Sequence, residues 1–196
     1  ERHGEAMDAA NREEALRAIQ RGSDRLVGVV EELLEVSRIE RGLVVLEKKE
    51  AALAPLVERA LAEMRAKVVD REISFRPSGD PGTAFVDAEK LVRLLIILLD
   101  NAVRYSPPGS PVEVTAERGE GEIVFSVLDR GVGIPEEERE RVFERFHQVG
   151  DVLHHAGPGL GLGLYIGKSI VDSHGGRIWH EPREGGGSVF RFTLPT

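Results

Sequence analysis

The sequence contains no cysteine, so disulfides and cysteine-ligated metal sites are excluded. Basic residues are in the minority, and the net charge of −8 argues against a nucleic-acid partner, because a phosphate backbone needs a basic face. The longest apolar run, residues 94–99, is much shorter than the roughly 20 residues that span a bilayer. No signal peptide is visible. We therefore expect a cytoplasmic protein, attached to a membrane only through a longer parent chain, if at all.

The 196 residues suit one domain or a domain with an appendage. Residues 13–41 have the pattern of one long helix, in which Ile19, Leu26 and Leu33 fall seven apart. Further apolar residues widen this stripe beyond a two-stranded seam, which favours a helix bundle. The alternative is an amphipathic helix that lies on its own domain. A helix stop at Gly42 divides the chain into residues 1–42 and 43–196.

Beyond Gly42, helical and strand patterns alternate. Strands are predicted at residues 43–49, 73–76, 85–86, 112–117, 122–128, 177–180 and 188–193. Helices are predicted at 56–69, 88–105 and 162–174, with a short acidic helix after Pro135 and a loop over 147–160. This order predicts an α+β domain, a two-layer sandwich with helices on one face of a mixed sheet.

The first motif with chemical meaning is Asp129-Arg130-Gly131-Val132-Gly133-Ile134. A carboxylate at the end of a strand, as Asp129 would be, can accept a hydrogen bond from an exocyclic amine such as that of adenine. Gly131 and Gly133 allow the backbone to turn close to a ligand, and Ile134 can cover a ring. The alternative is a plain connection from strand to helix.

A second glycine cluster covers residues 157–163 and leads into a predicted helix. The free N–H groups and the dipole of a helix N-terminus form an anion site. The cluster superficially matches a dinucleotide fingerprint, but that motif needs a strand directly before it and an acid about 20 residues later. A Walker sequence is also excluded, because no Gly-Lys-Ser/Thr follows.

The third motif is Asn101, which lies in a helix that is otherwise nearly all apolar, with Arg104 and Tyr105 shortly after it. A buried amide needs a partner, and its oxygen could ligate Mg²⁺. Arg104 shares the face of Asn101 and can reach a phosphate, while Tyr105 can pack against a base. The alternative is a helix C-terminal cap with satisfied polar groups.

Together, these three motifs resemble the N, G1 and G2 boxes of the GHKL ATPase superfamily, in its histidine kinase branch. Residues 143–146 are similar to the F box of that branch, and residues 25–40 to the second helix of a dimerisation and histidine-phosphotransfer hairpin. The second resemblance implies a homodimer through this helix. The C-terminal residues 187–195 also resemble this family. The resemblance covers about residues 13–196 and implies a Bergerat-type ATP-binding fold.

The resemblance also implies roles for single residues. Asp129 would bind adenine N6, Asn101 would hold Mg²⁺, and Arg104 would stand where a phosphate-binding lysine is usual. Residues 148–158 would form a mobile lid. The implied ATP-binding set is Asn101, Arg104, Tyr105, Asp129, Gly131, Gly133, Ile134, Phe146, Gly159, Leu160, Gly161, Leu162, Gly163, Leu164 and Ser188.

The sequence departs from the family pattern in two places. Four residues before Asn101, Ile97 replaces the usual asparagine, which removes one oxygen donor and is expected to weaken Mg·ATP binding or turnover. The phosphoacceptor histidine box is absent, because none of the six histidines has its context, and we expect its helix to precede Glu1. His154 and His155 are interpreted as solvated loop residues, since a zinc site would need a third ligand.

The sequence therefore predicts the catalytic part of a sensor histidine kinase, an ATP-dependent protein-histidine kinase. It would transfer the γ-phosphoryl group to a histidine outside these residues, and the group would then pass to a response regulator receiver domain. One alternative is an ATP-sensing or dimerising module in which Ile97 has weakened or removed turnover. Another is a different GHKL ATPase, such as an anti-sigma-factor serine kinase or a topoisomerase-type ATPase; the F box and the heptad helix argue against it.

Overall fold

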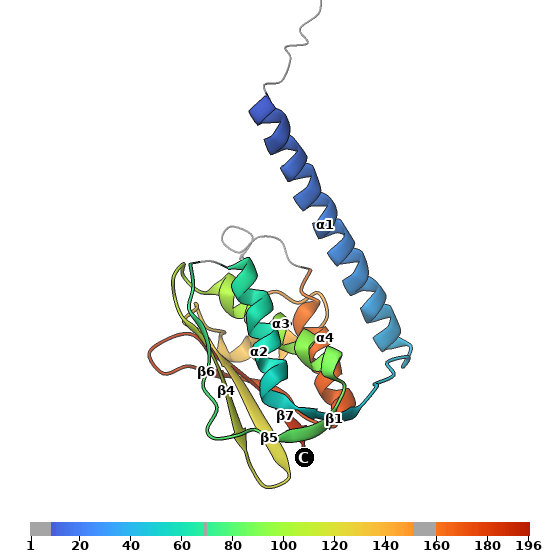
Figure 1. The fold of residues 1–196 in the computed structure, drawn as a ribbon, viewed down its shortest axis with the longest axis vertical. Coiled ribbons are helices and arrows are strands. Elements are labelled where there is room, and N and C mark those ends of the chain that lie inside the picture. The colour runs from blue at the N-terminus through green and yellow to red at the C-terminus, as the bar shows by residue number, and fades with distance from the viewer. Residues whose placement is uncertain (1–8, 69, 151–159) are drawn as a thin grey trace, which may run out of the picture.

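The computed structural model describes residues 9–68, 70–150 and 160–196. A helix of 32 residues, α1 (Ala9–Glu40), comes first, and its N-terminal half extends beyond the rest of the molecule (Figure 1). The long helix predicted over residues 13–41 is thus confirmed, with an earlier start. Within the described ranges, no helix is both long and apolar enough to cross a bilayer.

The elements after α1 form two sheets and three helices within the described residues. The small sheet pairs β1 (Lys49–Ala52) with β3 (Thr83–Val86). The large sheet has the order β2-β4-β5-β7-β6, and it is mixed because β2 and β4 are parallel while the other neighbours are antiparallel. Its strands are β2 (Ile73–Phe75), β4 (Val112–Arg118), β5 (Glu122–Leu128), β6 (Ile178–Pro182) and β7 (Ser188–Pro195). The helices are α2 (Leu53–Lys67), α3 (Ala88–Tyr105) and α4 (Gly163–His174), and two short 3₁₀ turns are η1 (Glu136–Glu138) and η2 (Arg141–Phe143).

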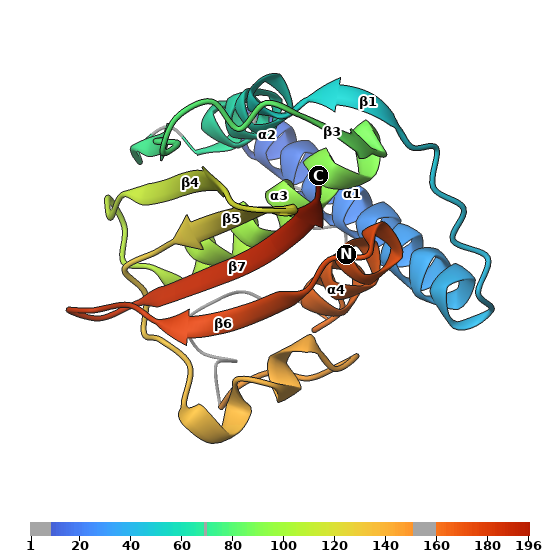
Figure 2. The ribbon, with the colours of Figure 1, turned by 90° about the horizontal axis from the view of Figure 1, so that it is seen from below.

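The helices α3 and α4 lie against one face of the large sheet, as Figure 2 shows. The apolar residues of α3 are buried between this sheet and the neighbouring helices, and Leu94, Leu95, Leu98 and Leu99 are fully enclosed. On the sheet side, Phe125 and Phe192 stack with ring centroids 4.9 Å apart. The prediction of an α+β domain with a mixed sheet and helices is confirmed.

Local sequence signals explain several element boundaries. The side chain of Asp87 accepts the Lys90 N–H at 3.1 Å and caps α3, as a carboxylate at this position should. The predicted hairpin turn joins β4 to β5, where the Gly119 N–H donates to the Glu122 carbonyl. Gly175, at φ 83°, ends α4 in the left-handed region that favours glycine. The acidic segment after Pro135 forms only the 3₁₀ turn η1.

The predicted strand over residues 43–49 is wrong. Residues 43–48 have no regular structure, and the strand starts at Lys49. Leu43 and Val45 are exposed, so the alternating pattern of this segment covers no core. This segment is fixed by a hydrogen bond to another part of the chain, in which the Glu47 N–H donates to Asp87 at 3.0 Å. Helix α2 also starts earlier than predicted, at Leu53, whose N–H donates to a loop carbonyl at Gly82.

Candidate functional site

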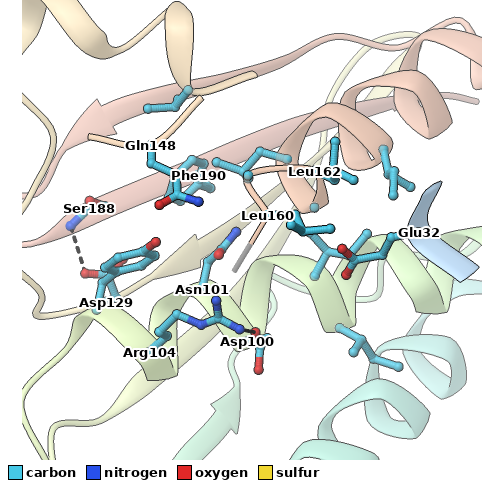
Figure 3. A pocket seen from close by; sticks show the side chains of 18 of the residues that line it. Glu32, Asp100, Asn101, Arg104, Asp129, Gln148, Leu160, Leu162, Ser188 and Phe190 are labelled. Carbon is cyan, nitrogen blue, oxygen red and sulfur yellow. Dashed lines mark hydrogen bonds and ion pairs between the residues drawn. The ribbon is translucent and has the colours of Figure 1, made fainter. Parts of the chain in front are cut away.

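A cavity of about 670 Å³ opens between α3, the N-terminus of α4 and the ends of β5 and β7 (Figure 3). It is lined by residues from all three of the motifs around Asn101, Asp129 and the second glycine cluster. Among the predicted ATP-binding residues, those that line it are Asn101, Arg104, Tyr105, Asp129, Gly133, Ile134, Leu160, Gly161, Leu162, Gly163, Leu164 and Ser188. Gly131 and Phe146 do not line it, and Gly159 lies outside the described residues, as does most of the predicted lid.

Asp129 follows β5 directly and is only 3% exposed. Its Oδ1 accepts two backbone hydrogen bonds, from Gly131 at 2.7 Å and from Ser188 at 3.1 Å (Figure 3). Within the described part of the chain, Oδ2 accepts none, so it can receive a donor from a ligand. Burial raises the pKa of this carboxyl, while the two N–H donors pull the pKa back.

Gly131 and Gly187 shape the turn that holds Asp129. A Cβ on Gly131 would lie 2.7 Å from the Tyr105 carbonyl oxygen, so only glycine fits between this helix end and the carboxylate. Gly187 has φ +108°, and a Cβ there would lie 2.2 Å from the Asp129 carbonyl oxygen. Gly131 therefore packs behind Asp129 and does not line the cavity, and its predicted role in ATP binding stays a prediction.

Helix α3 supplies one wall of the cavity. The Asn101 side chain is directed into the cavity in Figure 3, and among the described residues its amide has no hydrogen-bond partner. Arg104 forms an ion pair with Asp100 at 3.0 Å. Tyr105 is 38% exposed and lines the opening.

One turn before Asn101, Ile97 also lines the cavity but offers no polar atom. A Cβ on Gly163 would lie 3.4 Å from Ile97 Cγ2, so this side chain packs against the start of α4. The described residues contain no cluster of three His, Cys, Asp or Glu side chains that could hold a metal ion. Mg²⁺ usually keeps several waters and takes only one or two protein ligands beside phosphate oxygens. The free oxygen of Asn101 fits that pattern.

The second glycine cluster forms the opposite wall. Gly161 has φ +69°, and a Cβ there would lie 2.5 Å from the His147 carbonyl oxygen, because residues 146–147 cross it closely. The Phe146 N–H donates to the Gly161 carbonyl at 3.0 Å. The Phe146 ring is 56% exposed and lies outside the cavity, so this residue holds the glycine segment through its backbone. The first N–H groups of α4, which have no helical partner, are at this wall.

Sequence reasoning missed several residues of the cavity. Lys90 and Arg93 lie on α3, and Arg93 is one turn before Ile97, so helical periodicity could have found it. Gln148 precedes the glycine cluster, and Phe190 comes from β7. Glu32 belongs to α1, and no local pattern could have placed it at a cavity of the following domain.

The domain has a mixed sheet with helices on one face. One cavity brings together a buried acid, an amide without a partner among the described residues, and the glycine-rich start of a helix. These features define a nucleotide-binding domain of the α+β class. Residues 86–196 match the family described as "Histidine kinase-, DNA gyrase B-, and HSP90-like ATPase". The chain belongs to this family of ATP-binding domains, in its sensor histidine kinase branch.

Three similar proteins illustrate the relationship. The sensor protein KdpD of Clostridium acetobutylicum is 30% identical over 193 residues, 98% of this chain and 21% of that protein. The full-length ShkA structure in complex with AMPPNP has a TM-score of 0.82 and 26% identity, covering 97% of this chain and 40% of that one. The histidine kinase ThkA in complex with the response regulator TrrA has a TM-score of 0.75 and 28% identity, covering 100% of this chain and 53% of that one. The chain spans about a fifth to a half of the length of the curated relatives.

Proposed function

We propose that this chain binds Mg·ATP in the cavity and donates the γ-phosphoryl group to a histidine outside these residues, from which it passes to a response regulator. The observation that carries the proposal is Asp129, a buried carboxylate that lines the cavity. Its Oδ2, like the amide of Asn101 in the same cavity, has no hydrogen-bond partner among the described residues. The AMPPNP complex of ShkA and the complex of ThkA with a response regulator support it.

The residues suggest one orientation for the nucleotide. Asp129 Oδ2 accepts the adenine amine, and Ile134 and Tyr105 cover the ring. The phosphates lie along α3 toward Asn101 and Arg104, with the first N–H groups of α4 opposite. Asn101 would hold Mg²⁺, which when bound neutralises phosphate charge. The protein thus contributes positioning and charge neutralisation rather than covalent chemistry.

The described histidines argue that the acceptor lies elsewhere. His147 is paired with Glu138, and His174 is buried, with Nε2 accepting the Asp87 N–H at 3.0 Å. His180 is buried on the sheet. The other three histidines lie outside the described residues. Because phosphoryl transfer needs an acceptor in line with the γ-phosphate, we expect no self-labelling of the 196-residue chain.

Incubation with γ-labelled ATP tests this function. The 196-residue chain should stay unlabelled, and a longer form that includes sequence before Glu1 should acquire acid-labile, base-stable label, as phosphohistidine does. Label on the 196-residue chain itself would contradict an external acceptor. Acid-stable label would indicate a serine kinase.

Ile97 favours one second candidate, an ATP-binding module with little or no turnover. Its side chain packs against Gly163 where the family resemblance expects an oxygen donor. If the longer form binds ATP but stays unlabelled, Ile97→Asn should restore labelling. Ile97→Val, which changes volume without adding a donor, is the matched control and should not.

We also propose that the chain is a cytoplasmic homodimer. The support for the dimer is an apolar stripe on α1 that the described part of the molecule does not cover: Leu16, Ile19, Leu26, Val27, Val30, Leu33 and Leu34 are each at least 43% exposed. The cytoplasm is proposed because the reaction consumes ATP.

A further inference from the structure

Six charged side chains from two different elements lie at the cavity or beside it, spread along α3. Three cations come from α3: Lys90, Arg93 and Arg104. Three carboxylates lie beside them: Glu32 and Glu35 of α1, and Asp100 of α3. These six charges balance, and Glu63, Lys67 and Glu89, which also line the cavity, add no net positive charge that would attract a phosphate.

Glu35 makes the most specific of these contacts. Its Oε1 lies 2.9 Å from Lys90 Nζ, and its Oε2 lies 2.9 Å from Arg93 Nε. The Glu35 side chain is only 15% exposed, whereas Lys90 and Arg93 are 32% and 41% exposed and also line the cavity. A single carboxylate of α1 thus bridges two cations of the cavity wall.

Glu32 lies one turn earlier on α1 and lines the cavity itself, at the opposite side of Figure 3 from Asp129. Burial raises the pKa of its carboxyl, and Arg93 and Arg104 are the cations that oppose this rise. The two carboxylates therefore face the same cations that a bound phosphate chain would use.

Arg93 has the position of a phosphate ligand. It lies one helical turn from Ile97 and two turns from Asn101 on the cavity-lining side of α3, at about 5.4 Å per turn. A phosphate chain that runs from Asn101 toward the N-terminus of α3 meets no donor at Ile97, and the next side chain in line is Arg93.

We propose that Lys90 and Arg93 serve two ligands in turn: the carboxylates of α1, as seen here, and the phosphates of a nucleoside triphosphate. This inference rests on the proposed ATP site. Since both ligands need the same cations, each weakens the other by the same factor. Phosphate binding therefore releases α1 from the domain, which frees the domain to move toward an acceptor.

Paired calorimetric titrations with Mg·AMPPNP and with adenosine test the competition. Glu35→Gln should raise the affinity for AMPPNP about threefold to tenfold, the scale of one partly exposed ion pair, and leave the adenosine affinity unchanged. Glu31→Gln, an exposed position of α1 away from the cavity, is the matched control and should change neither. An equal gain for adenosine would overturn phosphate competition.

Arg93→Gln tests whether Arg93 binds both phosphate and α1 or contacts α1 alone. If Arg93 binds phosphate, this variant should weaken AMPPNP binding although it also breaks the contact with Glu35. If Arg93 only docks α1, the variant should behave like Glu35→Gln, and the proposal fails.

Release of α1 can be measured directly, because the chain has no cysteine of its own. Spin labels at Gln20→Cys on α1 and Glu120→Cys in the β4–β5 hairpin report the distance between helix and domain, with unlabelled chain added to dilute contacts between molecules. Mg·AMPPNP should broaden or shift this distance, and adenosine should not. If the distance does not change at saturating AMPPNP, the competition between α1 and phosphate is wrong but the proposed ATP site is not. If neither AMPPNP nor adenosine binds, the proposed ATP site is wrong as well.

Discussion

Asp129 and Asp172 offer a direct comparison at the scale of single residues, since one carboxylate is buried at the cavity and the other is exposed on α4. Asp129→Asn keeps the shape but replaces an acceptor with an amide, so we expect ATP affinity to fall by roughly 1.5–3 kcal/mol, about tenfold or more. Calorimetry measures this loss, and Asp172→Asn should not produce it. Wild-type affinity in Asp129→Asn would remove this carboxylate from the site.

His180 on β6 is expected to make stability depend on pH. It is 7% exposed, and its ring nitrogens have no hydrogen-bond partner among the described residues. Burial, followed by the nearby Arg139, lowers its pKa to about 4. In the unfolded chain a histidine takes up its proton near pH 6.5, so the folded state loses stability as the pH falls from about 6.5 to 4, by about 3 kcal/mol in total.

Urea unfolding at pH 7 and pH 4.5 measures this effect. His180→Phe, which can still pack edge-on against Phe190, removes the titrating group and should reduce the loss between the two pH values. The carboxylates titrate in both proteins, so the difference between them isolates the histidine. Equal losses in wild type and variant would show that His180 titrates normally.

At the scale of elements, the segment before α4 needs glycine at residue 161 for two reasons: its positive φ and the close approach of residues 146–147. Gly161→Ala would place a Cβ 2.5 Å from a backbone oxygen at φ +69°, so we expect the wall of the cavity to shift and ATP affinity to fall about tenfold. Gly109→Ala is the control, because φ is +76° there but nothing lies within 4 Å. Both variants should lose some stability by thermal denaturation, and equal ATP affinities would contradict a role for the Gly161 contact.

The linker after α1 shows how an element can be misjudged from its pattern. Residues 43–46, Leu-Val-Val-Leu, are apolar and partly β-branched, which predicts a strand, yet they pair with no strand of the described residues. Strand formation needs a partner edge, and here Asp87 accepts the Glu47 N–H while β1 pairs with β3 only from Lys49 onward. The partner is 40 residues away in the sequence, so the local pattern carried no information about it.

For the whole molecule, the apolar stripe of α1 predicts self-association. Leu26 is 67% exposed, and Leu26→Glu should shift the chain toward monomer in analytical ultracentrifugation, because a charge in an apolar seam is costly to bury. Gln20→Glu adds the same charge at a polar position of α1 and should leave the dimer intact. ATP affinity should be unchanged in both, and a dimer that tolerates Leu26→Glu would exclude this stripe as the interface.

Helix and strand periods, the Asp87 cap, the turn glycines and the three motifs were readable from the sequence because each depends on neighbours a few residues apart. The domain boundary at residue 42 and the lid over 148–158 stay predictions. Only the tertiary structure showed that Gly131 and Phe146 do not line the cavity. It also showed that the Ser188 N–H donates to Asp129 Oδ1 rather than Oδ2, and that Glu32 and Glu35 lie beside cations of α3. Those contacts join segments tens of residues apart, and their geometry depends on how the packed elements meet in space, which no local pattern specifies.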